Sequence, residues 1–344
     1  MNTIKKNDLK RALETVKPAL ASKEIIEQTT SFAFVNDKVV TYNDEICISY
    51  PIGDVGIKGA VKAEELYKFL GKVKEEEVTI TQEKDEIVLK AGRAKVGFAI
   101  QTEINLPLEE ELSETGDWKK LPKNFLKAIE FAIPCTSNDM SNPKLVCVNL
   151  DEKGVVEATD NFRVVQFKLS KKLPFSSTLV PAASLREVIK LAPTEVAQGK
   201  GWLHFKNVED TQISCRVFSD TFVDISGIIK KVKSKGIEFV FPDNVLEILD
   251  KAEVFTKGKT VHDESVDVAF DGKALSIESQ SEVAWFKERV PVKSKSTNFG
   301  FKITPYLLKD ILRETTTCTI LEHLLKFEKE EEWIYITSLR EGVK

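Results

Sequence analysis

The residues that could do catalytic or metal chemistry are few and scattered along the 344-residue chain. The three histidines, His204, His262 and His323, stand in strand-like or loop-like contexts and form no HExxH pattern, the spacing that holds zinc in metalloproteases. The chain has no GxxxxGK[ST] phosphate loop, no GxGxxG fingerprint and no GxSxG elbow. Acidic runs at 75–77 and 328–332 flank predicted strands, which is typical of solvated turns. The sequence therefore favours a protein that is not an enzyme and holds no metal or cofactor.

The cysteines show no metal-binding or disulfide pattern either. They are odd in number and include no CxxC pair, which is typical of reduced thiols in a cytoplasmic protein. No apolar run approaches the roughly 18 residues that cross a membrane, and the N-terminus lacks the apolar core of a signal peptide. The formal net charge of −4 and the 42% hydrophobic content allow two or three soluble domains without naming a partner.

The predicted helices and strands form a threefold repeat with a period of about 118 residues. Each copy contains a helix, strands joined by polar turns, a second helix, and further strands. The repeat predicts an α+β protein of three domains, 1–116, 117–233 and 234–344. Apolar residues at helical spacing predict the first helices at 7–16, 122–133 and 242–255, and the second helices at 61–73, 181–192 and 304–314.

Five of these six helices carry two basic residues four positions apart. Residues at this spacing share a helix face, and like charges there are unfavourable by roughly 0.2–0.5 kcal/mol per pair. Recurrence at matching places suggests a shared anionic partner, and a DNA phosphate backbone fits without any sequence reading. The alternative is a solvated helix face. The pairs are Lys6 with Lys10, Lys68 with Lys72, Lys123 with Lys127, Arg186 with Lys190, and Lys309 with Arg313.

Three segments carry a resemblance to a known family. They are ATDNFRV (158–164), VPAASLREVIK (180–190) and CRVFSDTFVDISGII (215–229). With the threefold order of elements, they make the chain similar to the bacterial-type DNA sliding clamp, the beta subunit of DNA polymerase III, and leave open a bacteriophage version. The resemblance implies the DNA-clamp fold and a head-to-tail homodimer. Helices would line a hole around double-stranded DNA, antiparallel sheets would lie outside, and the ring would tether a polymerase without doing chemistry.

The resemblance also assigns two sets of site residues. The basic pairs would face DNA without regard to its sequence, together with Lys23, which matches a basic residue after the first helix. A cleft would bind short peptide motifs of the polymerase and the clamp loader. The matching cleft positions are Leu145, Thr159, Asn161, Phe162, Arg163, Val164, Val223, Ile228, Tyr306, Ile336, Leu339 and Arg340.

The chain departs from the family pattern at the corner and at the tail. Asn161 stands for the turn glycine, which is acceptable because asparagine tolerates positive φ. Val223 replaces a proline, Ser338 replaces another in the tail, and the chain continues past Arg340. These changes put the peptide specificity in question, although we expect Phe162 and Val164 to form an apolar wall with Arg163 as a polar handle.

Two other functions stay open at this point. The first is a clamp-like protein-binding scaffold or regulator that does not encircle DNA. The second is an enzyme, which no motif favours. The basic pairs favour the sliding clamp.

Overall fold

The computed structural model describes residues 2–106, 108, 116–232, 235–256 and 263–343. These form two compact units, one of residues 1–126 and 173–219 and one of residues 127–172 and 220–344. The predicted division into three domains remains a prediction, and its second boundary, at 233 and 234, lies outside the described residues.

The six predicted helices are all present, some shorter than expected. Their apolar period explains them: in the first helix Leu9, Leu13 and Val16 are fully buried. They are α1 (Lys6–Val16), α2 (Ala63–Lys72), α4 (Phe125–Ala132), α5 (Ala182–Leu191), α7 (Val245–Glu253) and α8 (Pro305–Leu312). The sequence did not predict the short α6 (Ser226–Lys231) or the 3-10 turns η1 (Lys17–Ala19) and η2 (Ile133–Cys135).

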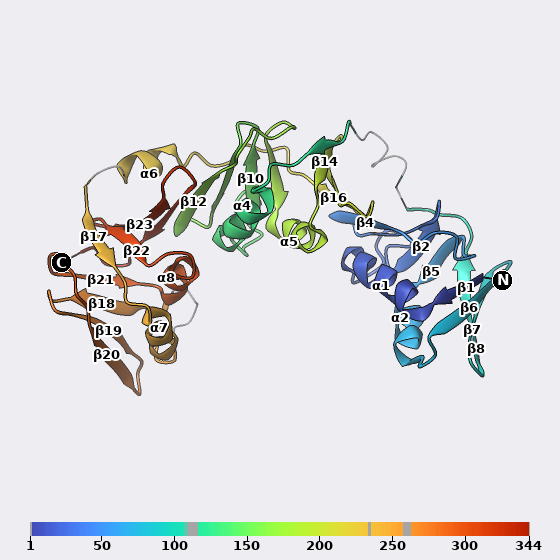
Figure 1. Cartoon of the computed structure of the whole chain (residues 1–344), viewed down its shortest axis with the longest axis horizontal. Helices are drawn as coiled ribbons and strands as arrows, with labels where there is room; N and C mark the ends of the chain where they lie inside the picture. The colour runs from blue at the N-terminus through green and yellow to red at the C-terminus, as the bar shows by residue number, and fades with distance from the viewer. Residues whose placement is uncertain (1, 107, 109–115, 233–234, 257–262, 344) are drawn as a thin grey trace. The chain divides into compact units, whose positions relative to one another are not determined.

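In the first unit one antiparallel sheet runs in the order β1-β6-β7-β8-β5-β2-β3-β4-β16-β15-β14-β9. Helix α1 packs against β3, β4 and α2 (Figure 1). The strands of this unit are β1 (Asn2–Lys5), β2 (Ser31–Val35), β3 (Lys38–Tyr42), β4 (Ile46–Pro51), β5 (Gly59–Lys62), β6 (Glu77–Glu83), β7 (Glu86–Ala91), β8 (Ala94–Gln101), β9 (Lys119–Lys120), β13 (Thr178–Pro181), β14 (Glu195–Gln198), β15 (Trp202–Lys206) and β16 (Gln212–Arg216).

Strand β4 joins the two chain segments of this unit by pairing with β16, with Ile48 opposite Ile213. Behind this pairing Tyr42 and Trp202 pack with ring centroids 6.1 Å apart, and both are buried. The sheet is therefore continuous through residues that are far apart in the sequence.

The second unit contains two antiparallel sheets. One includes the run β10-β11-β12-β24-β23-β22-β17 and the other is β20-β19-β18-β21. Helices α7 and α8 contact each other, while α7 lies on β19 and α8 on β24. The strands are β10 (Cys147–Asp151), β11 (Val155–Thr159), β12 (Arg163–Lys168), β17 (Ile237–Val240), β18 (Val266–Phe270), β19 (Ala274–Gln280), β20 (Trp285–Pro291), β21 (Phe299–Ile303), β22 (Thr317–Ile320), β23 (Leu324–Lys329) and β24 (Trp333–Ser338).

Candidate functional site

The predicted corner at 159–164 is a tight turn between β11 and β12. Asn161 has a φ of 73°, so the expectation that it takes the left-handed conformation is confirmed. The Thr159 hydroxyl donates to the Arg163 carbonyl at 2.7 Å, and the Asp160 carboxylate accepts the backbone N–H groups of Phe162 and Arg163 at 3.0 and 2.9 Å. These bonds fix the backbone locally, so the corner is a rigid platform for Phe162.

The Arg163 side chain lies inside the protein, with 5% of its surface exposed. Its guanidinium donates to Asp160 at 2.9 Å, to Asp310 of α8 at 2.6 Å, and to the Pro134 carbonyl. The guanidinium also lies 5.0 Å from the ring centroid of Tyr306. The pKa of Tyr306 is raised to about 12, and burial is the largest cause. The expected polar handle for a peptide is therefore not what the structure presents. Arg163 fastens the corner to α8 instead.

The chain's tail runs beside the corner as the sequence predicted. Val164 pairs with Ile336 in the β12–β24 ladder, and the Ser338 N–H donates to the Phe162 carbonyl at 2.8 Å. The next residues turn away: the Leu339 N–H donates to the His323 carbonyl at 2.9 Å, and Arg340 donates from Nη1 to the Glu264 carbonyl at 3.1 Å.

The predicted cleft residues divide by exposure. Leu145, Thr159, Val164 and Ile336 are buried, so they support the corner from inside and offer no open wall. A ligand could reach the exposed or half-buried members, which are Phe162 at 39%, Ile228 at 37%, Asn161, Val223, Tyr306, Leu339 and Arg340.

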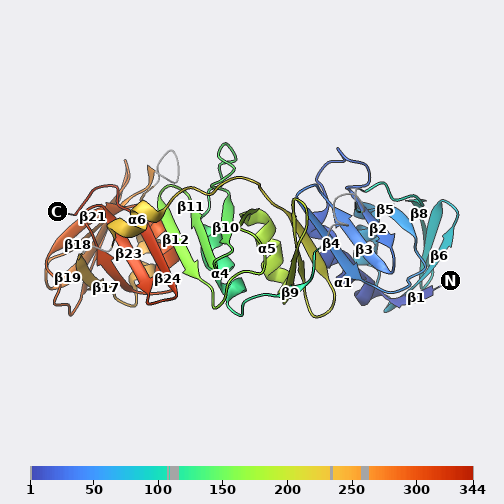
Figure 2. The ribbon, with the colours of Figure 1, turned by 90° about the horizontal axis from the view of Figure 1, so that it is seen from above.

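Helix α6 carries Ile228 and lies beside β23 and β12 in both Figure 1 and Figure 2. The connector, residues 217–225 between β16 and α6, is held by an ion pair of 3.0 Å between Lys144 and Asp220. Apolar side chains from the corner, the connector and the tail thus come from neighbouring segments of the second unit.

Four of the eleven predicted DNA contacts have exposed side chains with no carboxylate partner among the described residues. They are Lys23, Lys72, Lys123 and Arg186, and all four belong to the first unit. Lys123 stands two residues before α4 begins, so the expected pairing of Lys123 and Lys127 on one helix is wrong.

The other seven are already engaged. Lys309 shows the extreme case, because it is 15% exposed and lies 2.6 Å from both Asp250 and Glu253. Lys127 pairs with Glu332 and, with Lys329, holds the pKa of that carboxyl below its usual range. The remaining contacts are Lys10 with Glu14, Lys68 with Glu64, Lys190 with Glu187, Arg313 with Asp310, and Lys6 with the Val73 carbonyl.

His204 and the five cysteines lie in buried positions where proton transfer and nucleophilic attack are unfavourable. His204 is buried, its Nδ1 lies 2.8 Å from the Ser214 hydroxyl, and burial lowers its pKa to about 4. The five cysteines are free and buried, and burial raises the pKa of Cys47 to about 12. His323 is exposed, and His262 lies outside the described residues.

Within the described part of the chain, no three His, Cys, Asp or Glu side chains are grouped to hold a metal ion. In that same part, no helix is both long and apolar enough to span a membrane.

Sequence reasoning missed Asp310, the residue that ties the corner to α8. It lies 147 positions from Arg163, and no local pattern marks the pair. Sequence reasoning also missed the concave surface between α4 and α5 described below.

The architecture defines the fold. Over nearly its whole length the chain has the DNA-clamp fold of bacterial DNA polymerase III beta subunits. The DNA polymerase sliding clamp of Bacillus subtilis superposes with a TM-score of 0.82 at 17% identity, covering 98% of both chains. The beta subunit from Streptococcus pyogenes gives 0.83 at 19% over 99% of both chains, and that of Thermotoga maritima 0.81 at 17% over 98% of both.

Comparison with models of known protein families and with curated protein sequences gives no match. Three short motifs and the threefold order of elements suggested the resemblance to sliding clamps. The comparisons support it through the fold and not through the sequence.

Proposed function

We propose that the protein is a DNA sliding clamp, a processivity factor that encircles double-stranded DNA and tethers a polymerase. The observation that carries the proposal is the clamp fold over 98% of the chain at a TM-score of 0.82. In this proposal three domains, 1–116, 117–233 and 234–344, repeat twice in a closed ring. The protein is not an enzyme, and its cofactor-free role is consistent with the buried thiols and buried His204.

The ring forms from two chains joined head to tail. Strand β20 supports this, because it is an edge strand of its four-stranded sheet and its outward residue Trp285 is 72% exposed. Unpaired edge strands are templates for pairing with another chain. The first domain of a second copy would supply the other edge.

Partner proteins dock at the corner of the second unit. Phe162 supplies the exposed aromatic, and Ile228, Leu339, Val223 and Tyr306 supply further apolar surface. A polymerase or clamp loader would insert a short apolar motif there. Leu145, Thr159, Asn161, Arg163, Val164 and Ile336 would hold the corner in shape, and Arg340 would flank it.

DNA contact is electrostatic and independent of sequence, since phosphates are the only groups a basic surface must meet. Among the predicted contacts, Lys23, Lys72, Lys123 and Arg186 are exposed and form no ion pair with the described residues. The ion-paired cations at positions 10, 68, 127, 190, 309 and 313 would contribute less, and so would Lys6, which donates to the Val73 carbonyl. We place the protein in the cytoplasm, where thiols stay reduced.

Retention on DNA of different topology tests the function. The purified protein is loaded with a clamp loader onto nicked circular DNA, and half is then cut once to linear form. A sliding clamp stays on the circle and is lost from the linear form, while its mass in solution is that of a dimer. Equal loss from both forms contradicts encirclement and favours the scaffold, for which the neutralised Lys127 and Lys309 of the second unit are the supporting observation.

A further inference from the structure

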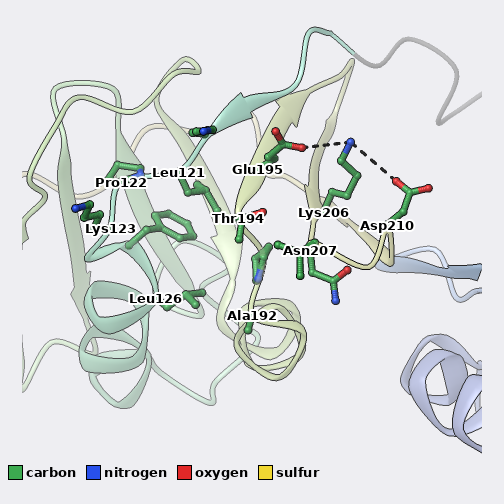
Figure 3. A pocket seen from close by; sticks show the side chains of 14 residues that line it. Leu121, Pro122, Lys123, Leu126, Ala192, Thr194, Glu195, Lys206, Asn207 and Asp210 are labelled. Atoms are coloured by element: carbon green, nitrogen blue, oxygen red, sulfur yellow. Dashed lines mark ion pairs between the residues drawn. The ribbon is translucent and has the colours of Figure 1, made fainter.

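A concave surface of about 810 Å³ lies in the first unit, and none of its lining residues belongs to the corner. The approach to α4, the end of α5 and the turn after β15 enclose it (Figure 3). Figure 3 shows Leu121, Pro122 and Lys123 on one side, and Ala192, Thr194 and Asn207 on the other. Its volume is in the range of sites that bind small molecules or short peptide segments.

The floor of this surface is apolar and stiff. Leu121, Pro122 and Leu126 line one wall and Pro193 the other, while Phe125 beneath them is 1% exposed. A proline in each wall fixes the local backbone φ. A ligand would therefore meet a preformed surface and lose less free energy in ordering it.

The turn after β15 holds an apolar side chain out at the rim. Val208 is 86% exposed. The turn beneath it is well ordered, because the Asn207 side-chain oxygen accepts the N–H groups of Glu209 and Thr211, each at 3.0 Å. The Asn207 amide also donates to the Leu191 carbonyl of α5 at 3.4 Å. The backbone on both sides of Val208 is thus held in place, and its side chain is an exposed apolar group at the rim.

The charges around the surface leave it with unmatched positive groups. Lys206 lies 3.3 Å from Glu195 and 4.0 Å from Asp210, so it engages both lining carboxylates (Figure 3). Lys120 and Lys123 line the same surface, and neither has a carboxylate partner among the described residues. A ligand with its own carboxylates would pair with these two lysines.

We propose that this surface binds a short acidic segment of a partner protein, with one large aliphatic side chain on the apolar floor and carboxylates on Lys120 and Lys123. Single-stranded nucleic acid is the less suitable occupant, since it binds by stacking on exposed aromatic faces. Here Phe125 is buried, and Lys206 covers the Trp118 ring at 4.5 Å. The proposal does not depend on encirclement of DNA.

Methyl NMR on the full chain without DNA tests the proposal. The probe is a blocked peptide with one leucine between two pairs of aspartates. We expect it to shift the methyl signals of Leu126 and Val208 in a saturable way. Lys120→Glu should weaken binding about tenfold, since it replaces a charge-assisted contact by repulsion. Lys90→Glu is the matched control, an exposed lysine on β7, and should leave the affinity unchanged.

Three results would overturn the proposal. The first is no saturable shift at either methyl group. The second is equal binding of peptides in which serine replaces the leucine or lysines replace the aspartates. The third is displacement of the acidic peptide by an oligothymidine that shifts the same methyl groups. Lys120 lies outside the predicted DNA-contact set, so its variant separates this site from DNA binding by Lys123.

Discussion

Replacing Arg163 with methionine should destabilise the second unit strongly. The guanidinium is 5% exposed and lies 2.9 Å from Asp160 and 2.6 Å from Asp310. Removing one partner of a buried ion pair costs about 3–5 kcal/mol, because the remaining charge stays buried without a counter-ion. Asp310 is 29% exposed and can regain water, whereas Asp160 is 8% exposed and cannot. We therefore expect a loss near the lower end, about 3 kcal/mol.

Hydrogen exchange of the β12 and β24 amides measures this loss where it occurs. A loss of about 3 kcal/mol corresponds to a fall in protection of roughly a hundredfold. Arg216→Met is the matched control, because Arg216 also forms a carboxylate pair, with Asp44 at 2.7 Å, but is 39% exposed. Exposed pairs contribute about 0–1 kcal/mol, so the control should lose less than tenfold at the β4 and β16 amides, which lie beside this pair in the first unit.

The reasoning fails if the two variants lose protection equally, or if Arg163→Met loses less than the control. A further check is the double variant Asp160→Asn, Arg163→Met. Removing the stranded carboxylate should restore part of the protection, and no restoration would mean that the buried charge is not the cause.

Three other perturbations have expected outcomes. The pKa of His204 is lowered to about 4 in the folded protein and lies near 6.5 in the unfolded chain. As the pH falls, the unfolded chain therefore takes up this proton first. The contribution of His204 to the free energy of unfolding is complete above pH 6.5 and is lost progressively towards pH 4. Between pH 7 and 5 this amounts to about 2 kcal/mol, and urea unfolding of His204→Gln should show that much less pH dependence. Replacing both Lys72 and Arg186 with glutamate should weaken DNA binding and flatten its salt dependence in a filter-binding titration. Arg313→Glu should have a smaller effect, because Arg313 already pairs with Asp310. Equal effects would contradict the assignment of Lys72 and Arg186 as DNA contacts. Phe162→Ala should weaken a polymerase-derived peptide roughly thirtyfold by calorimetry with little change in stability, and unchanged affinity would place the docking site elsewhere.

The helices could be predicted because their signal is local. Burial of Leu9, Leu13 and Val16 follows directly from apolar spacing on one short segment. The strand β1, of four residues, gave no such signal, and its place beside β6 depends on a partner about 75 positions away.

The partners of the basic residues, in contrast, could not be predicted from local spacing. The spacing of Lys309 and Arg313 suggested a free basic face. Lys309 instead pairs with Asp250 and Glu253 of α7, the one repeat helix that carries no such basic pair. Lys127 forms an ion pair with Glu332, which lies 205 positions away in the sequence. Such pairings are set by tertiary packing, so an i, i+4 pattern predicts which face a side chain occupies but not whether its charge is free.

The place of β24 in its sheet has a consequence for synthesis of the chain. This strand, Trp333–Ser338, lies between β12 and β23, so the sheet is interrupted until the chain has been made as far as Ser338. Until then β12 has no neighbour on that side, and the Ser338 N–H that holds Phe162 does not exist. Long-range closure of this kind is slow and leaves apolar strand edges exposed. A nascent chain should therefore expose the free edge of β12 to chaperones, and be unable to recruit partners at the corner, until β24 has left the ribosome and paired.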